Sequence, residues 1–409
     1  MVCKEWTKSV KGVDDVELGI PRTNPLIFHC TAPESGRAQG LVFVILDFGD
    51  AANSDHHRNF RAYLAETHNL LAVTVDYHCH QSRLPTGAQF SLSTEDLADL
   101  RALGAKHGIL EAEPATLIGA LATLTEHHEF DVHIAPSNGD YQNLGVIQAL
   151  DHLTVLADLL SMHEGGFDQE NIVAIGASHG AYIAHMISKF APNTLRAVID
   201  NSSYTDPGRG LLRVAPVILG NLRLNCRLVN KWIFDSPSSP NYFLRGRRMI
   251  RRTSTQSEIV EMGRFSQRTC QYRMIHSVHD GLEPIEEKRA QAQWLGEAGF
   301  DVVLKEISEQ QDSDSEMFKA SALGVEASLR TVFDYFYPTL TPKPGRLDCE
   351  LGSDIAYFCD DYYYSFLHQK DGCLMRVVPV PTAAPAPKFY GQSNYGRQRV
   401  EFHIGVIGY

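Results

Sequence analysis

A short glycine-flanked segment near the middle of the chain, Gly176–Gly180, constrains the fold more than any other feature. Residues 171–175 before it are typical of a buried strand, and residues 181–190 after it are typical of a helix that ends at Pro192. A serine on so tight a strand-to-helix turn lies close to backbone on both sides, so its second neighbours must be almost free of side chain. Gly176 and Gly180 meet this requirement, and the turn would present the Ser178 hydroxyl at a sheet edge. The alternative is an ordinary glycine-rich turn with an unreactive serine.

Continuous apolar runs recur on both sides of this turn and alternate with helical patterns. Such runs are typical of strands that are buried on both faces of a parallel sheet. The sequence therefore predicts an α/β fold with a doubly wound, mostly parallel sheet. The expected strands are 41–46, 70–75, 171–175, 195–200, 271–276 and 301–307, and the expected helices include 57–67, 143–160, 181–190 and 321–336.

Three segments fall outside this alternation. Residues 85–140 predict two helices between the strand that ends at Val75 and the helix that starts near Asn143. Residues 203–268 predict an inserted helical cap on the side of the sheet where active sites lie. The remainder, 341–409, predicts a small β appendage with a hairpin turn at Asp371-Gly372. We therefore expect a core formed by residues 1–202 and 269–340, a cap at 203–268, and an appendage with tail at 341–409.

Composition narrows the classes of function. The net charge of −12 argues against general affinity for nucleic acid or anionic membrane, so a small-molecule ligand or substrate is expected. There is no apolar run of about 18 residues and no leader pattern, which predicts a cytoplasmic protein. The eight cysteines lack paired spacing, and the histidine pairs such as His127-His128 lack ligand spacing, so neither metal nor cofactor is expected. The oligomeric state stays open.

A second motif supports a specific resemblance. The residues from His276 to Pro284, His-Ser-Val-His-Asp-Gly-Leu-Glu-Pro, are similar to the turn that carries the triad acid in many esterases and peptidases of the α/β-hydrolase superfamily. Together with the order of strands, elbow and helix, the chain resembles that superfamily over about residues 30–340. Segments 140–153 and 198–204 are similar to a bacterial branch of unassigned function. The resemblance implies acyl transfer to water, with Ser178 as nucleophile and Asp280 as acid. A solvated turn aspartate is the alternative for Asp280.

The base histidine is where the chain departs from the superfamily. The position expected to carry it, ahead of the final helix, reads Leu323-Gly324. Without an imidazole a serine hydroxyl stays protonated near neutral pH and loses most of its reactivity. His403 in the tail is the candidate substitute. For the oxyanion we expect donors from the N–H groups of His179 and Gly49, although the carboxylates of Asp47 and Asp50 nearby would oppose negative charge.

Arginines are concentrated in the expected cap, where they outnumber acidic residues by far. Guanidinium groups match carboxylates and phosphates, so Arg247 and Arg248 are candidates for binding an anionic group of the substrate. A solvated surface or an interface to an acidic partner is the alternative.

Two functions follow as hypotheses. The first is a serine hydrolase, an esterase or deacylase that removes an acyl group from a small metabolite, anionic if the arginines bind it. The second is a catalytically silent relative that binds a ligand or partner, because Leu323 stands where the base is expected.

Overall fold

A computed structural model describes residues 3–380 except 35, 82–88, 93, 110–112, 137–138, 163–165, 208–216, 229–244, 268–269, 309–316, 343 and 361. Its centre is an eight-stranded sheet with the order β1-β2-β4-β3-β7-β8-β11-β12. Strands β4 to β12 of this series run parallel, while β1 and β2 form an antiparallel edge. The bounds are β1 Lys4–Lys11, β2 Pro25–Ala32, β3 Leu41–Ile45, β4 Leu71–Asp76, β7 Ile172–Ala177, β8 Ala197–Asn201, β11 Gln271–Ser277 and β12 Asp301–Ile307.

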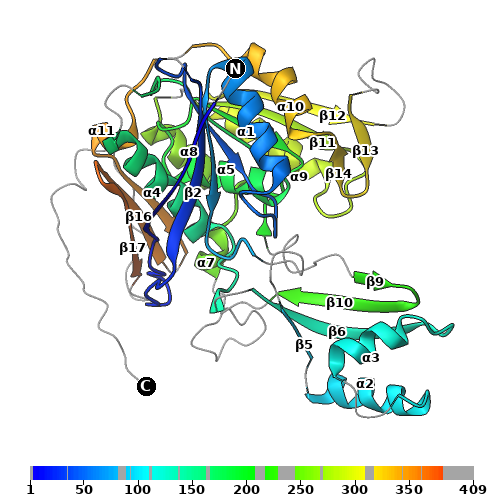
Figure 1. The fold of residues 1–409 in the computed structure, drawn as a ribbon. Helices are drawn as coiled ribbons and strands as arrows, with labels where there is room; N and C mark the ends of the chain where they lie inside the picture. Colours follow the sequence, from blue (N-terminus) through cyan, green and yellow to red (C-terminus); the bar gives the residue numbers. More distant parts are fainter. Residues whose placement is uncertain are drawn as a thin grey trace.

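Helices cover both faces of this sheet (Figure 1). On one face α1 and α10 bury Phe60, Leu64, Phe333 and Phe336 against alternate residues of the central strands. On the other face α4 and α5 contribute to the larger apolar core. Strands β3, β7, β8 and β11 are almost wholly buried, which explains their continuous apolar sequence. The bounds are α1 Asp55–His68, α4 Val146–Met162, α5 His179–Phe190, α9 Ile285–Glu297 and α10 Leu329–Phe336.

This arrangement confirms the doubly wound α/β prediction, with one local correction before the last core helix. The helix expected from Ser321 begins only at Leu329. The preceding residues form a hairpin of β13 (Lys319–Ser321) and β14 (Gly324–Glu326), and Gly324 has a φ of 111° that a leucine or histidine would rarely adopt. The hairpin therefore carries Leu323 at its turn.

The two insertions form one unit, which differs from the expected helical cap. Strands β9 and β10 of the second insertion pair with β6 of the first, in the order β5-β6-β10-β9. Helices α2 and α3 pack on this small sheet, and Figure 1 shows the unit beside the main body of the protein. The bounds are β5 Gln89–Ser91, α2 Thr94–Lys106, α3 Pro114–Leu121, β6 His128–Ala135, β9 Val217–Leu219 and β10 Leu222–Leu228. Two short helices, α7 Arg245–Ile250 and α8 Gln256–Phe265, follow on the core side.

The predicted β appendage is present as a three-stranded antiparallel sheet. It consists of β15 (Asp354–Cys359), β16 (Tyr362–Gln369) and β17 (Gly372–Pro379), and the two-residue turn is Lys370-Asp371, one residue before the expected Asp371-Gly372. Phe366 stacks on Phe190 of α5 with 4.0 Å between ring centroids, so the appendage completes the core beside that helix. A one-turn helix η3 (Tyr337–Thr339) and α11 (Asp348–Leu351) connect it to α10.

Two further properties concern the described part of the chain. None of its helices combines the length and the apolar character that crossing a membrane would need. The eight cysteines, all within the described residues, are free thiols.

Candidate functional site

The elbow at Ser178 has the geometry that the sequence predicts. Ser178 lies between β7 and α5 with φ 49° and ψ −113°, a conformation that costs a non-glycine residue about 1–3 kcal/mol. A Cβ at Gly176 would lie 2.4 Å from the carbonyl carbon of Gly180, and a Cβ at Gly180 would lie 2.3 Å from the Ile45 oxygen. Both glycines are therefore required by the close approach of β3, β7 and α5. The half-buried Ser178 has no side-chain hydrogen bond to any described residue.

The residue that follows the elbow, His179, is buried among aromatic rings. Its imidazole packs against Phe48, Tyr77, Tyr182 and Tyr204, and its Nδ1 forms a short hydrogen bond with the Tyr204 hydroxyl. Burial lowers the pKa of His179 to about 3, so the ring is neutral. Its Nε2 has no partner among the described residues. The ring of His179 thus has a structural role, and only its backbone N–H is available to a ligand at Ser178.

That backbone N–H already has an anionic partner. The His179 amide donates to Oδ1 of Asp47 at 3.3 Å. Asp47 follows β3 and starts a turn in which the Asp50 N–H donates to the Asp47 carbonyl at 3.2 Å, with Gly49 at φ 78°. In an acyl-transfer enzyme this donor stabilises the negative charge on the substrate oxygen. In this protein the His179 N–H already donates its hydrogen bond to the carboxylate of Asp47. The N–H of Gly49, the second predicted donor, has no partner among the described residues, and its role stays a prediction.

The predicted acid, Asp280, lies in the turn after β11. Its Oδ1 accepts hydrogen bonds from the N–H groups of Leu282 at 2.8 Å and Glu283 at 3.1 Å. Its Oδ2 lies 3.6 Å from Nε2 of His276. The side chain is 4 % exposed, and a Cβ at Gly324 would lie 3.7 Å from Oδ2. The free edge of the carboxylate thus faces the turn of the β13–β14 hairpin.

Leu323 lies where the superfamily would carry its base. The carbonyl of the preceding Ala322 accepts the Gly281 N–H at 3.0 Å, which holds the hairpin turn against the acid turn. The side chain of Leu323 is 69 % exposed, although leucine is apolar. A leucine side chain has no group that can accept a proton.

The end of β8 connects the elbow to the acid turn. The Ser178 N–H donates to the Asn201 carbonyl at 2.8 Å, and the Val325 N–H donates to Oγ of Ser202, also at 2.8 Å. Ser202 has a φ of 59°, and its Oγ would lie 2.8 Å from a Cβ at Gly324. Elbow, β8 end and hairpin are therefore neighbours at the carboxyl edge of the sheet, as the parallel topology requires.

Other described histidines near this edge are engaged elsewhere. His185 of α5 bonds Asp200 with 2.9 Å between Nε2 and Oδ2, and Nε2 of His276 bonds the Glu283 carbonyl at 2.9 Å. His279 is exposed on the acid turn. The remaining candidate base, His403, lies outside the described residues.

A buried network of ion pairs and hydrogen bonds surrounds Asp200, near the end of β8. Asp200 and Lys288 are fully buried, with 2.7 Å between Nζ and Oδ2, and Nζ also donates to Oγ of Ser203 at 2.9 Å. Burial raises the pKa of Asp200, but Lys288 and His185 outweigh this and hold the pKa below its ordinary value. No local sequence pattern indicates this network, because Lys288 lies on α9, far along the chain from Asp200.

Glu283, in the acid turn, is a second buried carboxyl group. Its Oε1 accepts from the Thr205 N–H at 3.0 Å and from the Thr205 hydroxyl. Its Oε2 is buried without a partner among the described residues. Burial raises the pKa of Glu283 to about 7. The sequence offered no reason to separate this glutamate from an ordinary surface residue.

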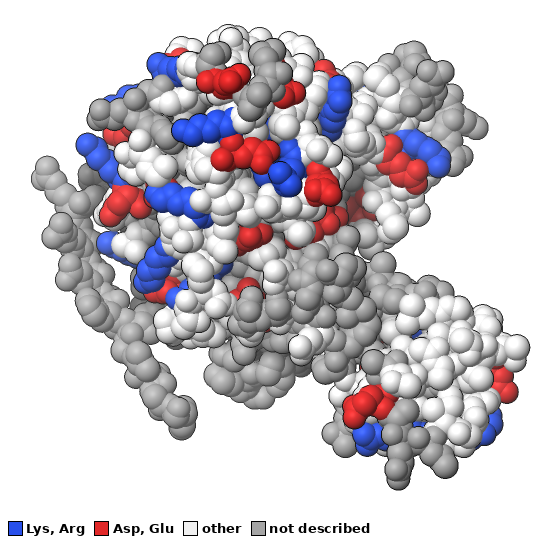
Figure 2. All heavy atoms as spheres, in the orientation of Figure 1, with Lys and Arg blue, Asp and Glu red and all other residues white. Residues whose placement is uncertain are grey.

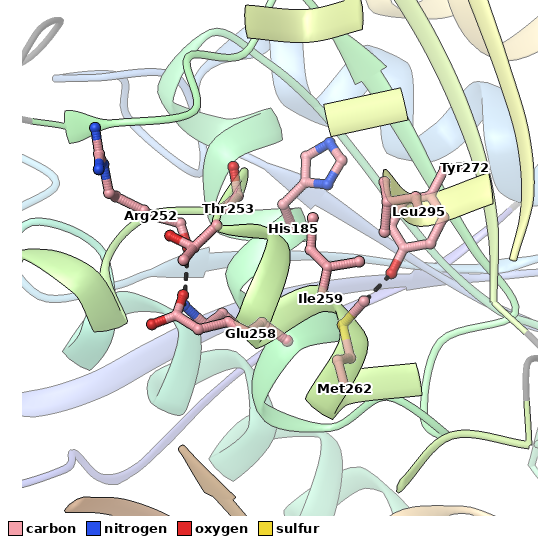
Figure 3. A pocket seen from close by; sticks show the side chains of 10 residues that line it. His185, Arg252, Thr253, Glu258, Ile259, Met262, Tyr272 and Leu295 are labelled. Atoms are coloured by element: carbon pink, nitrogen blue, oxygen red, sulfur yellow. Dashed lines mark hydrogen bonds and ion pairs between the residues drawn. The ribbon is translucent and has the colours of Figure 1, made fainter. Parts of the chain in front are cut away.

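A small pocket lies beneath these elements and is distinct from the elbow. It has a volume of about 20 Å³, enough for about one water molecule, and is enclosed by α5, α8, α9 and β11. Figure 3 shows His185, Tyr272 and Leu295 on one side and Glu258 and Met262 on the other. None of the predicted catalytic residues lines it.

The predicted anion-binding arginines are paired within the protein. Arg248 and Arg252 both bond Oδ2 of buried Asp206, at 2.9 and 3.0 Å. Arg247 lies 5.4 Å from the ring centroid of Tyr362 and donates to the Glu17 carbonyl at 3.3 Å. These contacts favour a structural role over the predicted one. On the face drawn in Figure 2, basic and acidic side chains are interspersed and form no large patch of one sign.

Buried Arg251 is also paired with an acidic side chain of this protein. It forms a bidentate pair with the carboxylate of Glu17, which is also buried and accepts the Tyr364 hydroxyl at 2.6 Å. Glu17 lies near the amino terminus, so counting charges within the expected cap could not reveal the pairing.

Several solved structures are similar to this chain. Acylaminoacyl peptidase of Pyrococcus horikoshii has 12% identity and a TM-score of 0.46, with 85% of this chain and 43% of the peptidase covered. The chain thus spans less than half of that protein's length. Brefeldin A esterase, a bacterial homologue of human hormone sensitive lipase, has 14% identity and a TM-score of 0.40, with 83% and 73% covered. Esterase 2 of Thermogutta terrifontis has 13% identity and a TM-score of 0.38, with 83% and 96% covered.

At these identities the likeness concerns the fold. The strand order and the elbow themselves define an α/β-hydrolase fold, which confirms the resemblance seen in the sequence. No curated protein matches the chain. One family model matches residues 7–114 and 118–377, and this covers most of the sequence, the elbow, the acid turn and the appendage included. The chain therefore belongs to the family described as protein of unknown function, DUF2920.

Proposed function

We propose that this protein binds a small-molecule ligand at the Ser178 elbow and does not hydrolyse esters by a Ser-His-Asp mechanism. The observation that carries the proposal is the hydrogen bond from the His179 N–H to the Asp47 carboxylate. A tetrahedral intermediate needs that donor for its own negative charge, and loss of one such donor costs about 10²–10³ in rate. A carboxylate in the same place also repels the developing charge.

The side chain of Leu323 supports the same proposal independently. Asp280 is held by two backbone N–H groups and faces the hairpin turn, but Leu323 supplies no imidazole there. A triad acid orients and stabilises a protonated histidine, so without the histidine it cannot activate Ser178. The two carboxylates Asp47 and Asp280 favour an uncharged or cationic ligand, and two arginines of the expected cap, Arg248 and Arg252, are already paired with Asp206.

The second candidate is a serine hydrolase, an esterase or deacylase acting on a small acylated metabolite. The strained backbone of Ser178 and the lack of a described partner for its hydroxyl favour this function. His403 would then supply the base, and binding of substrate would have to displace Asp47 from the His179 amide.

Turnover of p-nitrophenyl acetate separates the two functions. We expect wild-type protein and Ser178→Ala to hydrolyse the ester at the same background rate. Turnover that is well above this background, is lost in Ser178→Ala and falls at least tenfold in His403→Ala would establish the hydrolase instead. His279→Ala is the matched control, because His279 is exposed on the acid turn.

A further inference from the structure

The small unit formed by the two insertions contains a cluster of metal-ligating side chains, far in the sequence from the elbow. His107 follows α2, Glu126 precedes β6, and His128 is the first residue of β6. One ligand atom from each of the three side chains lies within 4.8 Å of the other two. We propose that His107, Glu126 and His128 bind a divalent transition-metal ion of the zinc class.

The imidazoles carry the first part of this proposal. Nε2 of His107 and Nε2 of His128 are both buried, and neither has a hydrogen-bond partner among the described residues. A buried polar nitrogen without a partner is uncommon, because the lost hydration costs about 1–3 kcal/mol. A metal ion would satisfy both nitrogens at once.

The donor set and its spacing fit zinc. Two imidazole nitrogens and one carboxylate oxygen are the ligands of many zinc sites, with bonds of about 2.0–2.2 Å. Tetrahedral bonds of that length place neighbouring donors about 3.3 Å apart. Nε2 of His128 lies 3.6 Å from Oε2 of Glu126, slightly beyond hydrogen-bond distance. Side-chain rotation alone can therefore bring the donors to binding distance.

The backbone around the cluster is held firmly. The His107 N–H donates to the Gly104 carbonyl at 3.0 Å, and the His128 N–H donates to the Asn221 carbonyl at 3.1 Å. The Asn221 side chain in turn donates to the Leu124 carbonyl at 2.8 Å. His107 also lies at the carboxyl end of a helix, where the helix dipole favours a cation. The ligands are thus presented by fixed elements.

The position suggests what the ion does. It would join the end of α2 to the start of β6 in the small unit beside the main body of the protein (Figure 1). A bound metal is a common source of added stability in small units. Three protein ligands leave a fourth position for water. The Glu126 side chain is 56% exposed and gives the ion a path from solvent. Lys106 lies 3.7 Å from Glu126 and would be displaced from it.

Zinc binding to the full chain tests the proposal directly. Protein stripped with a chelator and dialysed is titrated with ZnCl₂ by calorimetry, and cobalt is substituted to record the visible absorption of a tetrahedral site. We expect one ion per chain, a Zn²⁺-dependent rise in melting temperature, and at least a tenfold weaker affinity in His107→Ala and His128→Ala. His127→Ala is the matched control, since His127 is the exposed neighbour of His128 and lies outside the cluster.

Several outcomes would overturn the proposal. They are no binding by wild-type protein at 100 μM ZnCl₂, unchanged affinity in both histidine variants, or an equal loss in His127→Ala. Glu126→Gln keeps the shape of the side chain and removes its charge, so weaker binding with an unchanged circular dichroism spectrum separates ligation from loss of folding.

Discussion

The backbone N–H of His179 donates to the carboxylate of Asp47, with 3.3 Å between nitrogen and Oδ1. This contact joins the residue after the elbow to the loop after β3, the two segments that would together form an oxyanion hole. Under the proposed function, Asp47 and Leu323 would block two separate requirements of acyl transfer, the anion donor and the base.

Because the two obstacles are separate, removing both should increase activity more than removing either alone. We expect Leu323→His to raise Ser178-dependent turnover of p-nitrophenyl acetate at least tenfold, and Asp47→Ala on that background to add about 100-fold. Asp47→Ala alone should change little. No gain from Asp47→Ala on the Leu323→His background would show that Asp47 does not act through the oxyanion donor.

Substitution of either elbow glycine should destabilise the fold. In Gly176→Ala and Gly180→Ala the new methyl group would lie within 2.4 Å of backbone atoms, and overpacking of this kind costs about 1–3 kcal/mol or more. Urea denaturation followed by circular dichroism measures the loss. Gly296→Ala is the control, because Gly296 is exposed in α9 with open space around it, and there alanine should stabilise by about 1 kcal/mol. Equal stability of all three variants would contradict the packing at the elbow.

The buried ion pair of Lys288 and Asp200 should stabilise the fold far more than the neighbouring surface pair of Arg289 and Glu306. Lys288→Met leaves Asp200 charged and buried, so we expect a loss of about 3–5 kcal/mol in the free energy of unfolding. Arg289, the next residue, pairs with Glu306 at 2.6 Å on the surface, and Arg289→Ala should cost far less than Lys288→Met. A loss below 1 kcal/mol in Lys288→Met would mean that water reaches Asp200.

Glu283 should make stability depend on pH. Its pKa is about 7 in the folded protein and about 4.5 in the unfolded chain, so the folded state binds the proton more tightly. The associated stability is complete below pH 4.5 and is lost as pH rises to 7, by about 3 kcal/mol at most. Glu283→Gln keeps the contact with Thr205 and cannot ionise. The stability of this variant relative to wild type should therefore rise between pH 4.5 and 7, and a difference that is constant with pH would contradict the raised pKa.

The parts of the fold that local sequence determines were predictable. A strand such as Leu41–Ile45 is apolar throughout because both of its faces are covered, and the elbow needs only Gly176, Ser178 and Gly180 in the right order. The Asp371-Gly372 pair is likewise a local signal for the hairpin, whose turn is formed by Lys370-Asp371. Each of these features is complete within a few neighbouring residues.

Contacts between distant segments were not predictable. The pairing of β10 with β6 joins two insertions. From the sequence, one insertion was predicted to form two helices and the other a separate cap. The pair of Arg251 with Glu17 brings together residues from opposite parts of the chain, so the basic segment looked free when it is neutralised. His107 approaches His128 because α2 packs against β6, which is why the histidine pair alone gave no metal-ligand pattern.

The direction of the Asp47 side chain was likewise not predictable from the sequence. The sequence shows carboxylates near the expected oxyanion loop, but whether they point toward the His179 amide depends on the turn with Gly49 at φ 78°. The absence of an imidazole at position 323, in contrast, was visible from the sequence, and the structure adds that the neighbouring residues Ala322 and Gly324 lie beside the acid turn.

The rate at which a fluorophosphonate modifies Ser178 tests the central claim most directly, because the reaction needs an activated hydroxyl but no particular acyl group. Intact-mass measurements over hours should show no adduct on wild-type protein beyond that on Ser178→Ala, and clear labelling of the Asp47→Ala/Leu323→His variant. Stoichiometric labelling of wild-type Ser178 within minutes would contradict the account, since it would require a base and an anion donor that Leu323 and Asp47 exclude.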